Sequence, residues 1–247
     1  MILSSIDRLY GRNSVVEALH AGRRRIHRIL VAEQTHGLDH LLAEARAGRV
    51  RVERVDRQHL DRLIGSHHQG VIAEVEPFRY ARLDDIVGSA RAESPMLLVL
   101  DSLQDPQNFG TLLRTAQAVG VNGVLIPEHR AVGVTPAVSN ASAGAVEHLD
   151  VARVTNLART LQHLKTEGVW IHGLAVEAEQ PYWAADLSGP LALVVGSEGS
   201  GLGRLVRETC DVLVQIPMAT RSVQSLNASV AGSLVLYEAF RQRRTGA

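Results

Sequence analysis

The chain contains one cysteine, Cys210, in 247 residues. A single thiol excludes an internal disulfide framework and any zinc site built from cysteines. No apolar run approaches the roughly 20 residues that a membrane-spanning helix needs. The first eight residues also lack the charged start and apolar stretch of a signal peptide. We therefore expect a cytoplasmic protein that contacts no membrane and holds no metal.

Lysine is almost absent as well, since Lys165 is the one lysine among 26 basic side chains. The 26 acidic residues bring the formal net charge to zero. Phosphate binding favours positive charge, so this balance alone argues against a nucleic-acid partner. With 45% hydrophobic and 21% charged residues, the composition is that of a globular protein with one large domain or two small ones.

The charge is unevenly distributed along the chain. Residues 1–30 hold six arginines and two acidic residues, a net charge of +4. Residues 94–247 hold eleven basic and thirteen acidic residues, a net charge of −2. Seven of the eleven histidines precede residue 77. This asymmetry predicts a module that faces an anion, joined to a second module with another task.

The periodicity of apolar residues changes near residue 96. Residues 1–76 alternate short helical and strand patterns, which predicts a small α/β module, and the proline, glycine and charges of 77–95 predict a linker. Continuous apolar runs then alternate with helical patterns, which predicts a doubly wound parallel sheet over 96–247. We expect strands at 96–100, 123–126, 169–174, 191–195 and 212–216.

Ligands bind beyond the carboxyl ends of the strands in such sheets, so the polar segments after the apolar runs are candidate sites. In the first segment, Asp105 precedes Pro106 and can start a helix that carries Asn108 and Arg114. These last two side chains could flank a common site. Alternatively, Asn108 caps the helix end and Arg114 is a solvated surface charge.

The second segment, Gly196 to Gly201, is rich in glycine, which lets a backbone approach a ligand closely. It matches neither the dinucleotide-binding fingerprint nor a phosphate-binding P-loop. Glu198 would repel a phosphate, so the segment favours a cationic or polar ligand. A plain turn from strand to helix is the alternative.

The third segment runs from Ile216 through Met218 to Ser225 and Asn227, where a long helix begins. Serine and asparagine are preferred helix caps, and two of them at one helix start leave one free for a ligand. The small residues that follow allow another helix to pack closely: Ala228, Ala231 and Gly232.

The order of the three segments resembles the three motifs of the SpoU/TrmH-type RNA 2′-O-ribose methyltransferases of the SPOUT superfamily, over Met96 to Arg244. Tyr10-Gly11-Arg12-Asn13 and His68-Gln69-Gly70-Val71 are similar to the N-terminal domain of the subgroup that methylates a guanosine of 23S rRNA. That domain is itself similar to RNA-binding ribosomal proteins. The resemblance implies an RNA substrate-binding domain at 1–76, a linker at 77–95 and a SPOUT methyltransferase domain at 96–247.

The resemblance also implies a deep trefoil knot, an S-adenosyl-methionine pocket inside it, and a homodimer with the site at the subunit interface. The cofactor-binding residues it implies are Gly196, Ile216, Leu226, Ser225 and Asn227. The catalytic set it implies comprises Arg114, Asn108, Glu198, Ser225 and Asn227.

Arg114 is the general base in the proposal made for the family. Because arginine is almost never deprotonated in proteins, we favour a role in which Arg114 positions the ribose 2′-hydroxyl and stabilises the developing oxyanion. A phosphate of the substrate could help it act as a base. The 2′-hydroxyl is the group that distinguishes RNA from DNA.

We expect RNA to be held by the basic cluster of the first module and by its histidine-containing loop. A solvated run of charge is the alternative interpretation. The predicted contacts are Arg12, Arg23, Arg24, Arg25, Arg28, His68 and Gln69.

Three alternative functions are compatible with the sequence. One is a tRNA ribose methyltransferase of the same family, and the second is a resistance-type rRNA methylase or a non-catalytic RNA-binding protein. The third, a nucleotide-dependent oxidoreductase, lacks the expected fingerprint. The loop from Ala219 to Gln224 is one residue longer than expected for the family, which affects the geometry expected near Ser225.

Overall fold

The structure is a computed structural model that describes residues 6–90, 94–220 and 225–245. The chain forms two compact units. The N-terminal unit combines the residues up to Arg79 with the segment 134–148. The C-terminal unit combines 80–133 with the residues from Leu149 onward. The domain boundaries expected from sequence assigned 134–148 to the second domain, so the structure differs there.

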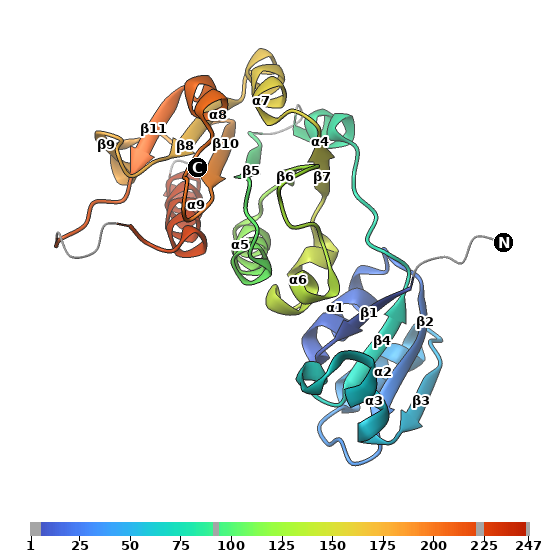
Figure 1. The fold of residues 1–247 in the computed structure, drawn as a ribbon. Helices are drawn as coiled ribbons and strands as arrows, with labels where there is room; N and C mark the ends of the chain where they lie inside the picture. Colours follow the sequence, from blue (N-terminus) through green and yellow to red (C-terminus); the bar gives the residue numbers. More distant parts are fainter. Residues whose placement is uncertain (1–5, 91–93, 221–224, 246–247) are drawn as a thin grey trace. The chain divides into compact units, whose positions relative to one another are not determined.

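The N-terminal unit is built on a four-stranded sheet in the order β1-β4-β2-β3 (Figure 1). β4 is antiparallel to both of its neighbours, whereas β2 and β3 are parallel. The strands are β1 (Asp7–Tyr10), β2 (Ile26–Ala32), β3 (Val52–Val55) and β4 (Val71–Val75). The helices are α1 (Arg12–Ala21), α2 (Asp39–Ala47), α3 (Arg57–Ile64) and the short η1 (Ser66–His68).

Alternation along the strands gives this sheet two apolar faces. One face carries Ile29 and Ala73 and packs with Val15 of α1 and Leu41 of α2. The other face carries Leu30 and packs with α3. Both faces are therefore buried.

The segment 134–148 joins the N-terminal unit through buried polar contacts. It contains α6 (Pro136–Ala141) and η2 (Ala145–His148). The Nε of Arg24 donates to Glu147 at 2.9 Å, and its Nη2 donates to the same carboxylate. The Oγ of Ser139 donates to Glu147 at 2.9 Å. Removing two charges from water is costly, so this pair must stay intact for both groups to remain buried.

The C-terminal unit contains a seven-stranded parallel sheet in the order β7-β6-β5-β10-β8-β11-β9. The α/β fold class predicted from the sequence is confirmed. The strands are β5 (Met96–Asp101), β6 (Gly123–Pro127), β7 (Val151–Val154), β8 (Trp170–Leu174), β9 (Gln180–Pro181), β10 (Leu191–Gly196) and β11 (Val212–Gln215). The helices are α4 (Leu83–Ala90), α5 (Pro106–Val119), α7 (Leu157–Thr166), η3 (Tyr182–Ala184), α8 (Arg204–Thr209) and α9 (Ala228–Thr245).

Helices cover both faces of this sheet. α4, α7 and α8 contribute to one apolar cluster with alternate strand residues such as Val99 and Val194. α5 and α9 pack together in the C-terminal unit (Figure 1). A Cβ at Gly232 of α9 would lie 2.7 Å from the Cδ2 of Leu112 and 3.0 Å from a methyl of Val195. Glycine at this position lets α9 pack directly on both α5 and β10.

The region 77–95, predicted as a linker, includes helix α4. Ile86 and Val87 of this helix are buried in the core of the C-terminal unit. This short amphipathic helix was not predicted from the sequence, because charged residues surround its two buried apolar residues. None of the helices within the described ranges has the length and apolar character needed to cross a bilayer.

We predict that Glu147→Gln lowers the free energy of unfolding by about 3 kcal/mol, because it removes the buried carboxylate that pairs with Arg24 and leaves the partly exposed Asp7, 3.4 Å away, as the counter-charge. Glu208→Gln, which removes an exposed pair with Arg204, should change it by less than about 1 kcal/mol. Urea unfolding followed by circular dichroism measures both changes. Tryptophan fluorescence would not report on the N-terminal unit, because the two tryptophans lie in the C-terminal unit. Equal effects of the two substitutions would contradict the importance of the buried pair.

Candidate active site

A pocket of about 480 Å³ lies in the C-terminal unit at the carboxyl ends of β8, β10 and β11. This is the position expected for a ligand in an open parallel sheet. Two of the three predicted segments meet there, because Gly196 of the second and Ile216 and Leu226 of the third line the pocket. The full lining comprises 174–177, 195–202, Arg207, Ile216, Met218, Ser225, Leu226, Ala228 and Ala231.

The wall formed by the glycine-rich loop depends on Gly196. A Cβ at this residue would lie 2.3 Å from the carbonyl carbon and oxygen of Gly201. Ser197 and Gly201 exchange backbone hydrogen bonds of 3.2 and 2.9 Å, which fold the loop back on the end of β10. No side chain fits at 196 without moving this backbone, so the sequence requirement for glycine has a steric cause.

Asp101 fixes the far end of the same loop. Its carboxylate is buried at the end of β5, beside Gly196 in the sheet register. It accepts a hydrogen bond of 2.7 Å from the backbone of Gly203 and one of 3.0 Å from the Oγ of Ser102. Sequence reasoning missed this residue, although a carboxylate at the end of a buried apolar strand was the signal.

Three predicted site residues form a hydrogen-bonded group beside the pocket. The Nδ2 of Asn108 donates to the Oε1 of Glu198 at 2.7 Å. The Nδ2 of Asn227 donates to the Oδ1 of Asn108 at 2.9 Å and also to Glu198. These residues come from α5, the glycine-rich loop and the start of α9, so the group joins the three sequence segments.

Asn227 also caps α9, as its position predicted. Its Oδ1 accepts hydrogen bonds from the backbone of Ser229 at 2.9 Å and of Val230 at 3.3 Å. At the start of α5, the corresponding cap is Asp105 and not Asn108. The amides of Asn108 and Asn227 are therefore both directed to Glu198, and Ser225 remains in the pocket lining.

Arg114 is exposed on α5, six residues after Asn108. Six residues of helix advance about 9 Å along the axis. The structure therefore does not bring Arg114 into the group formed by Asn108, Glu198 and Asn227. Its guanidinium is accessible to a macromolecular substrate that approaches α5.

Two pocket residues were missed by sequence reasoning. Glu177 follows β8, and its Oε1 lies 2.5 Å from the Nη1 of Arg207 in α8. Both side chains are about half exposed, so the pair closes one side of the pocket without being removed from water. Glu177 follows a strand that the sequence predicts. Ligands bind beyond the carboxyl ends of such strands, so the position of Glu177 could have identified it as a candidate site residue.

The predicted RNA contacts in the N-terminal unit require a correction. Arg24 is bound to Glu147, and the side chain of His68 is fully buried, with its Nε2 2.9 Å from Asp61 and its Nδ1 accepting from the backbone of Gly70 at 2.8 Å. Burial makes both side chains inaccessible to RNA, so their interpretation as RNA contacts was wrong. Clustered sequence positions could not reveal these internal partners.

Arg28 is also engaged within the unit. Its Nε donates to Glu74 at 2.8 Å, and its Nη1 lies 3.2 Å from Glu53. The hydrogen bond from Arg28 holds the pKa of Glu74 below its ordinary value. Arg28 is therefore paired with two carboxylates, which it shares with Arg8 and Arg51.

The other predicted contacts are more accessible. Arg23, Arg25 and Gln69 are exposed, and Arg12 is half-buried with a hydrogen bond of 3.4 Å to the carbonyl of Gly37. The backbone N–H of Arg12 donates to the side chain of Gln69 at 3.3 Å. The two motifs that contain Arg12 and Gln69 thus meet in the folded unit.

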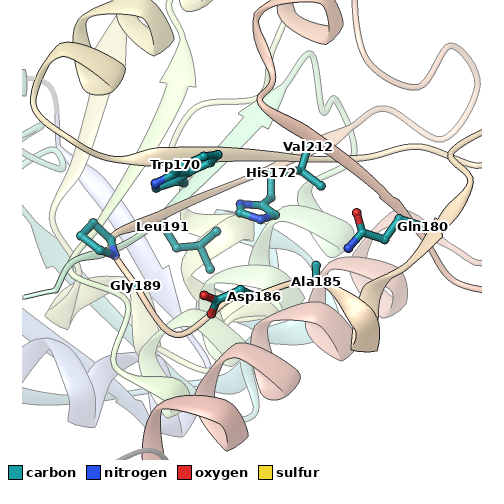
Figure 2. A pocket seen from close by; sticks show the side chains of 9 residues that line it. Trp170, His172, Gln180, Ala185, Asp186, Gly189, Leu191 and Val212 are labelled. Carbon is teal, nitrogen blue, oxygen red and sulfur yellow. The ribbon is translucent and has the colours of Figure 1, made fainter.

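A second, smaller pocket of about 260 Å³ lies at the opposite ends of β8, β10 and β11 (Figure 2). Trp170, Leu191 and Val212 begin these strands, and His172 and Asp186 also line the pocket. Burial lowers the pKa of His172, which favours its neutral form. None of the predicted site residues lines this pocket. Residues 221–224 of the loop predicted to be long lie outside the described part of the chain.

The fold combines a parallel α/β unit, with a pocket at the carboxyl ends of its strands, and a small α/β unit. The profile of the SpoU rRNA Methylase family matches residues 95–237. The profile for RNA 2′-O ribose methyltransferase substrate binding matches residues 8–81. The chain belongs to the SpoU rRNA methylase family, which confirms the predicted family and enzyme class.

Individual relatives agree with this assignment. The chain is 45% identical, over 96% of both sequences, to the Bacillus subtilis protein YacO, which is assigned to the TrmH family of tRNA/rRNA methyltransferases. The SpoU methyltransferase AviRb from Streptomyces viridochromogenes, solved with AdoMet, is 25% identical with a TM-score of 0.81, over 97% of this chain and 91% of that chain. An AdoMet-bound rRNA methyltransferase from Sinorhizobium meliloti is 26% identical with a TM-score of 0.79, over 96% of this chain and 87% of that chain.

We predict that Asn227→Ala lowers the free energy of unfolding of the C-terminal unit by about 1–2 kcal/mol, since it removes the cap of α9. Asn227→Ser restores a capping oxygen but not the amide that binds Glu198, and should recover most of that loss. Urea unfolding followed by tryptophan fluorescence measures both variants. If serine recovered nothing, the capping role of Asn227 would be wrong.

Proposed function

We propose that this protein methylates a ribose 2′-hydroxyl in RNA, with S-adenosyl-methionine as the methyl donor and a guanosine of 23S rRNA as the target. The observation that carries the proposal is that the second and third segments line one pocket beyond the sheet, while Asn108 of the first binds Glu198 of its lining. The membership of this chain in the SpoU family gives the reaction class, methyl transfer to RNA. The match of residues 8–81 to a substrate-binding domain supports an RNA substrate.

The pocket suits the proposed cofactor in size and chemistry. A volume of about 480 Å³ lies within the roughly 300–1,000 Å³ typical of small-molecule sites. The backbone near Gly196, Ile216 and Leu226 would hold the adenosine and methionine parts, with Ser225 and Asn227 nearby. When bound, S-adenosyl-methionine supplies an electrophilic methyl group on a positively charged sulfur. The carboxylate of Glu198, in the same lining, complements that charge.

Asn108 and Asn227 have a positioning role in this proposal. Their two amides donate to one oxygen of Glu198, which fixes its carboxylate relative to α5 and the start of α9. A carboxylate held in advance loses less freedom when a ligand binds. The catalytic set therefore divides into a preorganised group at the pocket and an exposed arginine on α5.

Arg114 would contact the ribose of the RNA. A guanidinium donates several hydrogen bonds in a fixed plane, so it can orient the 2′-hydroxyl and stabilise negative charge on its oxygen as the proton leaves. No histidine or cysteine lines the described part of the cofactor pocket. We infer that the proton passes to solvent as the bond between the 2′-oxygen and the methyl carbon forms.

We predict that Arg114→Ala abolishes methyl transfer while the affinity for S-adenosyl-methionine stays within about threefold of wild type, because transition-state stabilisation is lost and ground-state cofactor contacts are not. Gln117→Ala, at another exposed position of α5, is the matched control and should retain activity. Single-turnover methylation and calorimetry separate the two effects. Wild-type methylation by the Arg114→Ala enzyme would rule out both roles assigned to this arginine.

A homodimer is part of the proposal. Val230, Leu234 and Tyr237 form one stripe on α9 with exposed fractions of 47%, 40% and 53%. Exposed apolar stripes of this kind favour burial in an interface. The stripe lies on the helix that Asn227 caps, which supports placing the dimer interface near the site. We further propose the family's trefoil knot in the C-terminal unit and a cytoplasmic location.

RNA binding by the N-terminal unit is assigned to Arg12, Arg23, Arg25 and Gln69. We predict that the double change Arg23→Gln and Arg25→Gln weakens RNA binding and reduces the slope of log K against log salt by about 1.4, since about 0.7 is lost per phosphate contact on a single strand. The matched control is Arg159→Gln, an exposed arginine of α7. An unchanged salt slope in the double variant would contradict this interface.

The proposed target can be separated from its alternatives in cells. Mapping of 2′-O-methyl groups in rRNA and tRNA, with and without the gene, should show loss of one mark in 23S rRNA. Loss of a tRNA mark would favour the tRNA methyltransferase. Loss of no native mark, with gained drug resistance when the gene is expressed, would favour a resistance-type rRNA methylase.

A further inference from the structure

The histidines of the N-terminal unit include a cluster that the proposed function does not use. His20 lies in the last turn of α1, and His40 and Glu44 lie one turn apart on α2. One donor atom from each residue lies within 4.8 Å of the other two. The Nε2 of His20 is 3.2 Å from the Oε2 of Glu44, and the Nδ1 of His40 is 3.8 Å from its Oε1.

These separations match the coordination sphere of zinc. With zinc–ligand bonds of about 2.0–2.1 Å, neighbouring donors in a tetrahedron are about 3.3 Å apart, and the centres of two imidazole rings are about 5 Å apart. The ring centres of His20 and His40 are 5.7 Å apart, with the planes tilted by 57°. Small side-chain rotations would bring all three donors to one ion.

The backbone that carries the cluster is held in place by the core. Ala18 of α1 and Leu41 and Ala45 of α2 are buried in one apolar cluster. His40 and Glu44 share a helix face because they are four residues apart. The three side chains are between about one third and two thirds exposed, so an ion can reach them.

The charges around the cluster favour a cation. Within the described ranges, the ion-pair partners of Glu44 are His20 and His40, so no arginine neutralises this carboxylate. Glu17 lies behind His20, with its Oε2 3.9 Å from the Nδ1, and is itself held by His148 at 2.7 Å. A carboxylate on the far nitrogen of a histidine ligand is the usual support of a zinc site.

We propose that His20, His40 and Glu44 bind one Zn²⁺ ion, with solvent as the fourth ligand, and that this ion links α1 to α2. Two imidazoles and a carboxylate form a donor set that zinc uses in proteins. The sequence prediction of no metal rested on the single cysteine, and it did not consider histidine ligands from two helices. The site is separate from the pocket of the C-terminal unit and does not depend on the proposed methyl transfer.

The test is a titration of the full chain, produced without a histidine tag and stripped with a chelator, with Zn²⁺ by calorimetry and with Co²⁺ by visible absorption. We expect one ion per chain, cobalt bands of a tetrahedral site, and a rise in the unfolding temperature with Zn²⁺. Binding should weaken between pH 8 and pH 5.5, because the ligand nitrogens must be deprotonated.

Variants assign the ion to this cluster. His20→Gln and His40→Gln should each weaken binding by more than about tenfold, and Glu17→Gln by about tenfold, as for support residues of other metal sites. His163→Gln, an exposed histidine of α7 in the other unit, is the matched control and should bind as wild type does. Unfolding curves in chelator check that each variant is folded.

Two results would overturn the proposal. One is a dissociation constant of the wild-type protein for Zn²⁺ larger than about 100 μM, which would show that the cluster does not bind zinc specifically. The other is equal binding by wild type, His20→Gln and His40→Gln, or equal weakening by His163→Gln, which would place the metal elsewhere on the surface.

Discussion

Strand β10 lies between β5 and β8 in the sheet, although both precede it in the chain, and the position of the candidate site depends on this pairing. The pairing sets Gly196 beside Asp101, so two loops leave the sheet from adjacent strand ends. Asp101 then binds the glycine-rich loop, and Gly196 permits that loop to fold back closely. Loss of this register would separate Glu198 from Asn108, which are 90 residues apart in sequence.

The charge that each unit can offer to a ligand differs from the net charge counted along its sequence. The basic N-terminal end has a formal surplus of positive charge, yet Arg24 and Arg28 are paired with buried or half-buried carboxylates of their own unit. The charge available for a phosphate backbone is therefore carried by fewer arginines than the sequence count implies. In the C-terminal unit, a carboxylate lines a pocket proposed to hold a cation. Each unit thus has local charge that suits its proposed ligand.

The sequence predicted most strands of the large sheet because strands buried on both faces are continuous apolar runs. It missed β1 and β7, in which Arg8 and Arg153 interrupt short apolar runs, and α4, whose buried Ile86 and Val87 are surrounded by charges. The segments at the pocket were found by their position after strands. The burial of Arg24 and His68 was not predictable, because their partners Glu147 and Asp61 are identified only once the unit is folded.

The most direct test of the central claim, that the glycine-rich loop at the end of β10 forms the cofactor pocket, is calorimetric binding of S-adenosyl-methionine to two alanine variants. Gly196→Ala places a Cβ 2.3 Å from the backbone of Gly201, whereas a Cβ at Gly88 of α4, outside the pocket lining, meets nothing within 4 Å. We predict that Gly196→Ala weakens binding by more than about tenfold, equivalent to about 1.4 kcal/mol, and that Gly88→Ala binds as wild type does. Equal binding by Gly196→Ala and wild type would contradict the location of the pocket.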